Sequence, residues 1–265
     1  MICQICGART KNFLKKSFSV PFNFEADYRK CCDCGLVFSA THREMSESER
    51  DELNSAYHAR HVGETNPNDP NWLSRVTSQA NSICSAASSG LIDIDADWLD
   101  FGSGTGELSS RVNVQSGKRM SKFEPYGETN ERDFRHVDDI PRNHFALTVS
   151  TAVFEHLNFR NEWDNIHETV SEIGAMAVHT LVCEDVPRDP TWFYYLPVHS
   201  TFFSNKSMSL LHRQWGYSCS VYDVDARLWF WFKRSPDSIH KLVKGADNSK
   251  SGNFLFARGF LDYWK

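Results

Sequence analysis

Four cysteines near the N-terminus stand in two matching pairs whose spacing could bind a metal ion. Cys3 and Cys6 form the first pair, and Cys31 and Cys34 form the second after an interval of 24 residues. Each Cys-x-x-Cys pair is followed by glycine, so a tight turn can bring its two sulfurs to one side. Four thiolates in this arrangement suit tetrahedral Zn²⁺, and a site filled by four protein ligands is structural. The pattern therefore predicts a small zinc ribbon.

The alternative is that these cysteines are unrelated reduced thiols. Disulfides are not expected, because the N-terminus lacks a basic region followed by an apolar stretch and so shows no secretory signal. The same observation predicts a cytoplasmic protein.

A second stretch, Trp98 to Leu108 (WLDFGSGTGEL), could hold an anionic or nucleotide-like cofactor. It reads as a buried strand, a glycine turn and a helix N-terminus. Glycines at 102, 104 and 106 remove side chains that would block a ligand, and the helix start offers free N–H groups. A dinucleotide-binding turn would need a third glycine where Glu107 stands, which ranks a dinucleotide oxidoreductase last.

An acidic residue follows the next predicted strand, which runs from Met120 to Pro125. Glu124 stands at the end of this strand, beside Pro125. A carboxylate at a second strand end can accept hydrogen bonds from both hydroxyls of a ribose. This placement predicts that Glu124 and Pro125 contribute to the same cofactor site.

The order of these segments resembles the S-adenosylmethionine-dependent methyltransferases of the Rossmann-like class, over about residues 90 to 234. The resemblance implies that Gly102, Ser103, Gly104 and Gly106 contact the methionine part of the cofactor. It also implies that Asp100 lies near the amino group of the cofactor, and that the loop with Asp138 and Asp139 contacts its adenine.

Glu155 and His156 follow a strand predicted at Phe145 to Thr151, as in the Glu-His segment common in these enzymes. His199 opens a stretch similar to the family's His-x-x-x-Phe sequence. Both histidines fall at the edge of an open sheet where ligands bind, and histidine is a suitable base near neutral pH. We expect Glu155, His156 and His199 to be catalytic. Alternatively, Glu155 caps a helix and the histidines are structural hydrogen-bonding residues.

Tyr57, His58, Arg60 and His61 lie between the ribbon and the glycine turn. They are predicted to bind substrate as part of a lid. The alternative interpretation is a solvated helix end.

The alternation of strands and helices predicts an α/β fold: a Rossmann-like, seven-stranded, mostly parallel sheet with helices on both faces. Periodic apolar residues predict a helix from Asn71 onward and another from Trp163 to Ile173, with Gly174 as its C-cap. Further strands are expected at the ranges 175–183, 219–224 and 227–232.

The chain divides into four predicted parts. Residues 1–40 form the ribbon, 41–90 a helical linker or lid, 91–234 the cofactor-binding domain, and 235–265 a tail that docks on this domain. No apolar run is long enough to span a bilayer.

A zinc ribbon, helical linker and glycine-turn domain in this order resemble bacterial methyltransferases that modify sugars and surface polysaccharides. The resemblance implies methyl transfer to a small-molecule or glycan acceptor, a sugar or nucleotide-sugar, with O-methylation by in-line displacement preferred. One alternative is an RNA-base methyltransferase, which the formal net charge of −5 disfavours. Another is a non-catalytic scaffold that only binds the cofactor.

Overall fold

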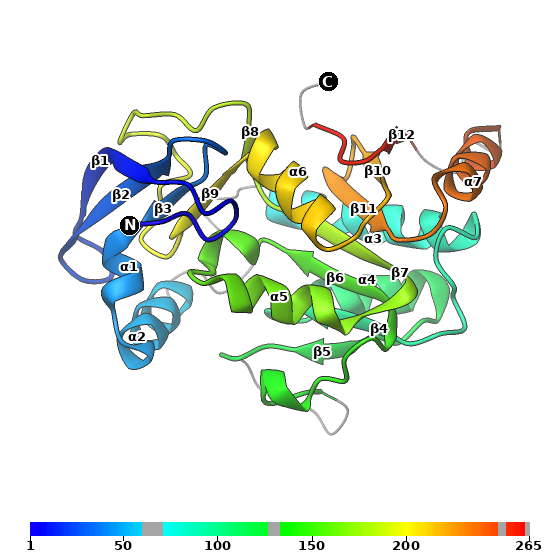
Figure 1. The fold of residues 1–265 in the computed structure, drawn as a ribbon. Helices are drawn as coiled ribbons and strands as arrows, with labels where there is room; N and C mark the ends of the chain where they lie inside the picture. Colours follow the sequence, from blue (N-terminus) through cyan, green and yellow to red (C-terminus); the bar gives the residue numbers. More distant parts are fainter. Residues whose placement is uncertain (60–70, 127–132, 249–252, 263–265) are drawn as a thin grey trace.

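Two β-sheets lie side by side in the computed structural model (Figure 1). The structure describes residues 1–59, 71–126, 133–248 and 253–262. A five-stranded sheet contains the N-terminal segment, and a seven-stranded sheet contains the glycine turn. Among the described residues, no helix combines the length and the apolar character needed to cross a membrane.

The larger sheet has the strand order β12-β10-β11-β7-β6-β4-β5. Its strands are β4 (Trp98–Phe101), β5 (Ser121–Phe123), β6 (Phe145–Thr151), β7 (Val170–His179), β10 (Cys219–Asp223), β11 (Leu228–Phe232) and β12 (Phe254–Arg258). The strands β5, β4, β6 and β7 pair in parallel, whereas β11, β10 and β12 join by antiparallel pairing.

The expectation of a mostly parallel sheet is therefore wrong, because the sheet is mixed. A short turn over residues 224–227 links β10 to β11, and strands joined so tightly can pair only antiparallel. The C-terminal segment then returns as β12 beside β10.

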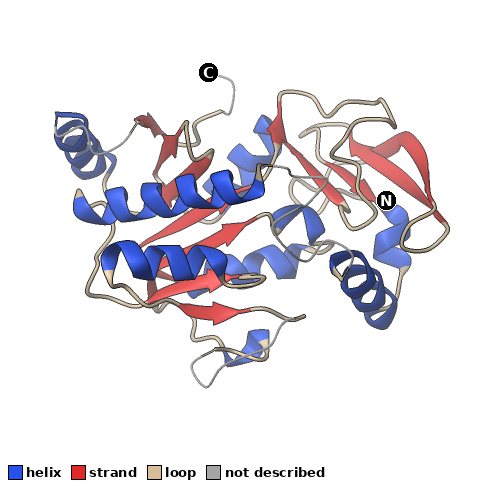
Figure 2. Cartoon of the chain, turned by 180° about the vertical axis from the view of Figure 1, so that it is seen from behind, coloured by secondary structure: helices blue, strands red, loops and turns tan. Residues whose placement is uncertain are grey.

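Helices cover both faces of this sheet (Figure 2). They are α3 (Trp72–Ser88), α4 (Glu107–Ser116), α5 (Arg160–Thr169), α6 (Asn205–Gln214) and α7 (Pro236–Asn248). Apolar side chains of α3, α4 and α7 pack into one core with one face of the strands. Those of α5 and α6 pack on the opposite face around Trp163 and Trp229.

One predicted helix ends earlier than its periodicity suggested. Helix α5 stops at Thr169, and Val170 already begins β7, so the predicted helix end at Ile173 and the C-cap at Gly174 are wrong. Gly174 lies inside β7, where a Cβ atom would stand 2.6 Å from the carbonyl oxygen of Phe145. The strand therefore needs glycine at this position for close backbone approach.

The smaller sheet joins distant parts of the chain. Its strands, in sheet order, are β1 (Thr10–Phe18), β2 (Phe24–Cys31), β3 (Val37–Ser39), β9 (Thr201–Ser204) and β8 (Val182–Cys183). The strand expected over 175–183 is thus two strands in different sheets. Because β3 pairs with β9, the N-terminal ribbon is fixed to the segment that follows His199.

Two helices follow the ribbon in the chain. Helix α1 (Ala40–Glu44) follows β3, and α2 (Glu47–His58) begins at a capping box formed by Ser46 and Glu49. Reciprocal hydrogen bonds between these two residues satisfy the first free N–H groups of α2.

Candidate functional site

The glycine turn leaves the carboxyl end of β4 and is held by the neighbouring strand. The N–H groups of Gly102 and Ser103 donate to the carbonyl oxygen of Phe123 in β5, at 2.7 and 3.1 Å. All three glycines of the turn have positive φ, which glycine adopts without strain. A Cβ atom on Gly104 would meet no atom within 4 Å in the described part of the chain, so the turn has open space on this side.

Glu124 lies directly against this turn. Its Oε2 accepts a hydrogen bond of 2.7 Å from the N–H of Gly104, and its Oε1 accepts one of 3.1 Å from the N–H of Tyr126. The structure thus brings the end of β5 and the glycine turn together, and exposed Pro125 follows. Asp138 and Asp139 are exposed in the 3-10 helix Val137–Asp139.

Asp100 is a buried carboxyl group beneath the turn, with 1% of its surface exposed. The hydroxyl of Ser109 in α4 donates to its Oδ2 at 2.5 Å. Burial raises the pKa of Asp100 to about 6, and the bond from Ser109 opposes that rise. A cationic group placed beside this carboxyl would stabilise its ionised form.

Replacing Asp100 with asparagine should alter the pH dependence of stability. The folded pKa is about 6, above the unfolded value of about 3.9. Protonation therefore favours the folded state, and this contribution is lost as pH rises from about 4 through 6. Relative to Asp100→Asn, the wild-type free energy of unfolding should fall by about 1.4 kcal/mol between pH 5 and 7.5. Urea unfolding at both pH values measures this difference. The exposed Asp95→Asn variant is the control, and an equal pH dependence in wild type and Asp100→Asn would contradict the assignment.

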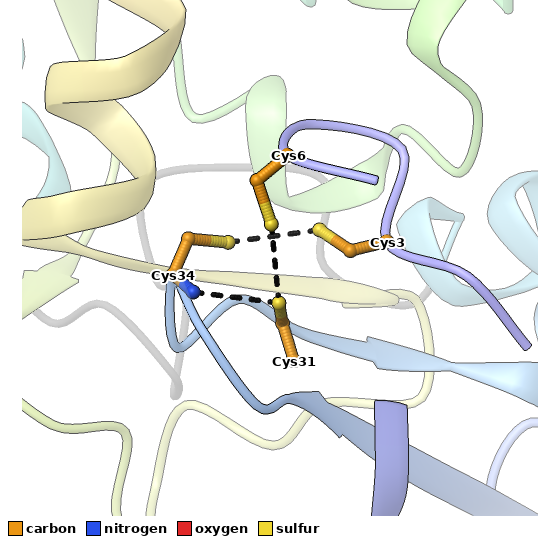
Figure 3. Close-up of side chains that lie close together, drawn as sticks. All are labelled: Cys3, Cys6, Cys31 and Cys34. Carbon is orange, nitrogen blue, oxygen red and sulfur yellow. Dashed lines mark hydrogen bonds between the residues drawn. The ribbon is translucent and has the colours of Figure 1, made fainter. Parts of the chain in front are cut away.

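The four N-terminal cysteines converge at the edge of the ribbon (Figure 3). The Sγ atoms of Cys3 and Cys34 are 3.6 Å apart, and those of Cys6 and Cys31 are 3.4 Å apart. A tetrahedron of sulfurs around Zn²⁺ has edges of about 3.8 Å, given a Zn–S bond of about 2.3 Å. The backbone N–H of Cys34 also donates to Cys31 Sγ at 3.4 Å. The four thiols therefore fit a tetrahedral zinc ion.

This cysteine cluster is attached to the larger sheet's helical layer. Ser204, which caps α6, donates from its hydroxyl to the carbonyl oxygen of Cys34 at 2.5 Å. Gln214 at the other end of α6 donates to the carbonyl oxygen of Ile5 at 2.7 Å. Both cysteine turns are thus fixed to one helix.

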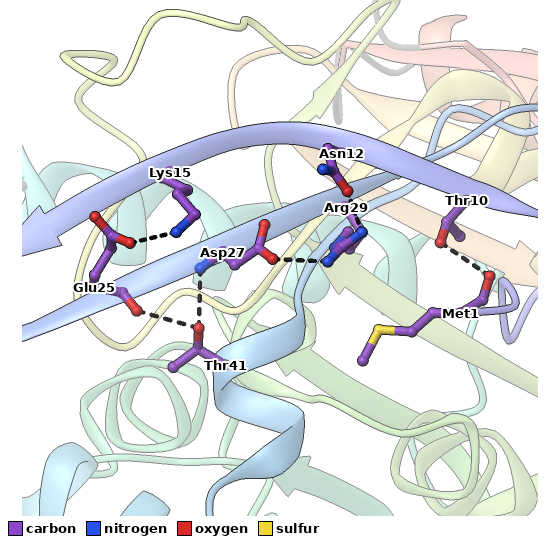
Figure 4. Close-up of polar contacts among 8 residues, drawn as sticks. All are labelled: Met1, Thr10, Asn12, Lys15, Glu25, Asp27, Arg29 and Thr41. Carbon is purple, nitrogen blue, oxygen red and sulfur yellow. Dashed lines mark hydrogen bonds and ion pairs between the residues drawn. The ribbon is translucent and has the colours of Figure 1, made fainter.

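The face of the ribbon around β1 and β2 carries paired charges (Figure 4). Lys15 forms an ion pair with Glu25 at 2.7 Å, and Arg29 forms one with Asp27 at 2.9 Å. Lys30 is paired with Asp185 from outside the ribbon. These neighbouring acids reduce the positive field that the basic residues would otherwise present to a polyanion.

Glu155, His156 and His199 come together at the carboxyl edge of the larger sheet. Glu155 and His156 lie in the 3-10 helix Phe154–His156, which follows β6. The ring centroids of His156 and His199 are 4.8 Å apart. The N–H of Ser200 donates to the carbonyl oxygen of Glu155 at 2.8 Å, and this bond fixes the two segments side by side.

Both histidines of this site are neutral at physiological pH. Burial lowers the pKa of His156 and of His199 to about 3. Nδ1 of His199 lies 2.9 Å from the carbonyl oxygen of Tyr194, which can only accept. Nδ1 therefore carries the proton, and Nε2 of His199 keeps its lone pair.

Two further side chains hold Glu155, and the sequence did not single them out. The hydroxyl of Tyr194 donates to Oε1 at 2.7 Å, and that of Thr180 donates to Oε2 at 2.9 Å. Tyr194 stands within an aromatic loop segment, Trp192-Phe193-Tyr194-Tyr195, whose aromatic composition was the available signal. Thr180 follows β7 and had no distinguishing sequence context.

Helix α2 contacts both parts of the site. Asp51 on α2 accepts a hydrogen bond of 3.2 Å from the hydroxyl of Tyr126, close to Glu124. At the end of α2, the ring of His58 lies 5.7 Å from that of His156. Tyr57 is buried against Leu53 and Val198.

Arg60 and His61, predicted to bind substrate with Tyr57 and His58, lie outside the described residues.

The glycine turn and the Glu155 segment are in direct contact. A Cβ atom on Gly102 would stand 2.4 Å from Cγ2 of Val153, two residues before Glu155. The glycine turn and the segment that carries Glu155 and His156 therefore lie at one edge of the sheet.

No protein-family model matches this sequence, and no curated protein matches it. Similar solved structures include Burkholderia thailandensis 1,6-didemethyltoxoflavin-N1-methyltransferase with bound 1,6-didemethyltoxoflavin and S-adenosylhomocysteine. The TM-score is 0.48 at 15% identity, over 76% of this chain and 95% of that chain. A SAM-dependent methyltransferase from Archaeoglobus fulgidus has a TM-score of 0.39 at 11% identity, over 68% of this chain and 90% of that chain. An O-methyltransferase family protein from B. thailandensis has a TM-score of 0.39 at 12% identity, over 58% of each chain.

Proposed function

We propose that this protein is an S-adenosylmethionine-dependent methyltransferase. The observation that carries the proposal is the glycine turn at the end of β4, with open space at Gly104 and a carboxylate on either side. Asp100 lies buried beneath the turn, and Glu124 contacts it from β5. These groups fit a ligand with a cationic amino group and a ribose, because carboxylates stabilise the first and accept from the hydroxyls of the second.

The bound cofactor supplies an electrophilic methyl group on a sulfonium. In this proposal Gly102, Ser103, Gly104 and Gly106 give its methionine part close access to the backbone. Asp100 would stabilise its amino group, Glu124 and Pro125 would hold its ribose, and Asp138 and Asp139 would bind its adenine.

The cluster of Glu155, His156 and His199 is proposed to activate the acceptor. A neutral imidazole can accept the proton of an acceptor hydroxyl. Positioned bases contribute about 10²–10⁴-fold, and the low pKa of these histidines places them at the lower end of that range. Nε2 of His199 has the required lone pair, because Nδ1 donates to Tyr194. The main task of the protein is alignment, since a well-oriented acceptor can gain about 7–11 kcal/mol over a free one.

The acceptor proposed is a hydroxyl of a sugar, nucleotide-sugar or surface glycan. The order of ribbon, linker and glycine-turn domain supports a sugar or glycan acceptor. The two neutral histidines support it too, because they can accept the proton of a sugar hydroxyl. An RNA-base acceptor is the alternative; the net charge of −5 and the paired charges of the ribbon argue against it.

The four cysteines are proposed to hold a structural Zn²⁺. Cys3, Cys6, Cys31 and Cys34 fill all four positions of a tetrahedral ion, which leaves no position for substrate.

The proposed function is tested by cofactor binding and by methyl transfer. Calorimetry should show binding of S-adenosylmethionine and none of NAD. Incubation of the full chain with methyl-labelled cofactor and cell extract should label the glycan or nucleotide-sugar fraction. Binding of NAD alone would contradict the proposal, label in RNA would favour the RNA-base alternative, and binding without transfer would favour a scaffold. His199→Ala should lower kcat about 10²-fold, the lower end of the range for a positioned base, while cofactor affinity stays at the wild-type value.

A further inference from the structure

We propose that Glu155, His156 and His199 form a second metal site, for a divalent transition-metal ion, separate from the four cysteines. The inference deepens the proposed function and rests on it, because the ion would act on the acceptor of the methyl group.

The three side chains offer one ligand atom each within 4.8 Å of one another. Two imidazoles and one carboxylate are a donor set that binds zinc or iron and leaves coordination positions open for a substrate. Glu155 and His199 are buried, whereas His156 is half-buried, so the cluster has one side toward the open edge of the sheet. The four-cysteine cluster has a different character, because thiolates fill all of its positions.

The groups that surround the cluster already orient two of the three ligands. Nδ1 of His199 donates to the Tyr194 carbonyl oxygen at 2.9 Å, which directs Nε2 as the ligand atom. The hydroxyls of Tyr194 and Thr180 each donate one hydrogen bond to Glu155. An ionised carboxylate has about four acceptor positions, so free lone pairs remain for an ion. Hydrogen-bonded ligands of this kind are the usual outer shell of a metal site.

The charge of the site also points to a cation. Glu155 has 2% of its surface exposed. Within the part of the chain that the structure describes, the ion pairs formed by lysine, arginine and histidine do not include this carboxylate. A buried carboxylate without a positive partner is costly, and such groups are commonly paired or bound to metals. A divalent ion between Glu155 and the two imidazoles would place a positive charge beside this carboxylate.

The proposed ion gives the cluster a definite role. It would bind the acceptor's oxygen and lower the pKa of that hydroxyl, as metal ions do for bound water. The acceptor O–H bond then loses its proton to solvent, a C–O bond forms, and the S–CH₃ bond breaks. The bonding pair of that bond stays on sulfur and leaves S-adenosylhomocysteine. The role of His199 in the proposed function is thereby refined: the lone pair of its Nε2 would bind the ion, and both histidines would act on the acceptor through that ion.

The first test counts metal ions in the full chain. After equilibration with Zn²⁺ and dialysis, plasma mass spectrometry should find two zinc ions per wild-type chain. His199→Ala and Glu155→Gln should retain one. His144→Ala is the matched control, because His144 is exposed and stands at the opposite, amino end of β6; it should retain two. One zinc in the wild type, or two in both site variants, would overturn the proposal.

A second measurement separates this site from the thiolates without any variant. Mn²⁺ prefers oxygen and nitrogen ligands to soft thiolates, so added Mn²⁺ should leave the cysteines loaded with zinc. In wild-type protein depleted of the second ion, the electron paramagnetic resonance signal of free Mn²⁺ should decrease until one ion is bound per chain. No saturable loss of signal, together with a single zinc, would exclude the site even if the variants failed to fold.

Failure of the metal site can be distinguished from failure of the proposed function. If the wild type holds one zinc, binds S-adenosylmethionine and transfers methyl, and added metal does not change its rate, the proposed function stands and the metal site is wrong. A chain that holds two ions but binds no S-adenosylmethionine keeps the site and overturns the function.

Discussion

Cys34→Ser is expected to lower the free energy of unfolding by more than about 5 kcal/mol, because zinc binding in small cysteine sites contributes about 10–16 kcal/mol to folding. Cys34 is 1% exposed, and Cys3 and Cys31 are each 2% exposed. Losing one ligand would leave buried thiols facing one another without the ion proposed to join them. The loss is comparable to the whole stability of a typical domain, about 5–15 kcal/mol.

Cys32→Ser is the matched control for this prediction, because Cys32 lies in the same turn but is exposed. Urea unfolding and zinc content, measured together on both variants, should show loss of stability and of zinc only in Cys34→Ser. A Cys34→Ser protein with wild-type zinc content and stability would contradict the zinc assignment. So would a wild-type protein that contains no metal after purification under reducing conditions.

Loss of the zinc ion should also loosen the segment that holds the His156–His199 pair. Strand β3 begins three residues after Cys34 and pairs with β9. The N–H of Ser39 donates to the carbonyl oxygen of Ser200 at 2.7 Å, next to His199. Zinc removal should therefore increase the hydrogen exchange of residues 199–204 along with that of the ribbon.

The parts that sequence predicted best are those whose chemistry is local. Two Cys-x-x-Cys-Gly turns need only short-range geometry, and the structure brings all four sulfurs together. The glycine turn also carries its own signal, because Gly102, Gly104 and Gly106 all adopt positive φ there.

What sequence could not predict depends on contacts between distant segments. Val170 and Ile173 continue the helical periodicity of Trp163 and Ile166, yet Val170 is 1% exposed and Ile173 is 71% exposed. Pairing with β6 makes this segment a strand. The spacing of its apolar residues alone does not show that a partner strand is available.

Tyr194 shows the same limit within the candidate site. Its hydroxyl contacts Glu155 and its carbonyl oxygen contacts His199, although it lies 39 residues from Glu155. From the sequence, an aromatic residue in a loop is expected to pack against other apolar side chains. The hydrogen bonds of its hydroxyl become visible only in the structure.

Gly104→Val is expected to weaken binding of S-adenosylmethionine by at least about 100-fold, or about 2.7 kcal/mol, while the protein stays folded. A Cβ atom at Gly104 would meet no atom of the described residues within 4 Å, so a valine side chain would extend into the space proposed for the cofactor. Gly117→Val is the control that shows whether backbone strain alone can cause this loss of affinity. Gly117 has φ +73 and equally open space, but it lies at the far end of α4. Both variants should lose about 1–3 kcal/mol of stability from the left-handed conformation, and only Gly104→Val should lose affinity in calorimetry.

A substitution at Gly102 should instead reduce stability through a packing clash. A Cβ atom there would stand 2.4 Å from Cγ2 of Val153, so Gly102→Ala should cost about 1–3 kcal/mol from overpacking in addition to strain. Val153→Ala in the same chain removes the clashing methyl group and should restore part of that stability. A side chain at position 104 should thus block ligand access, whereas one at position 102 should disturb packing against the segment that carries Glu155. Wild-type affinity in Gly104→Val would place the cofactor elsewhere on the molecule, because the open space at this turn is what the proposed function depends on.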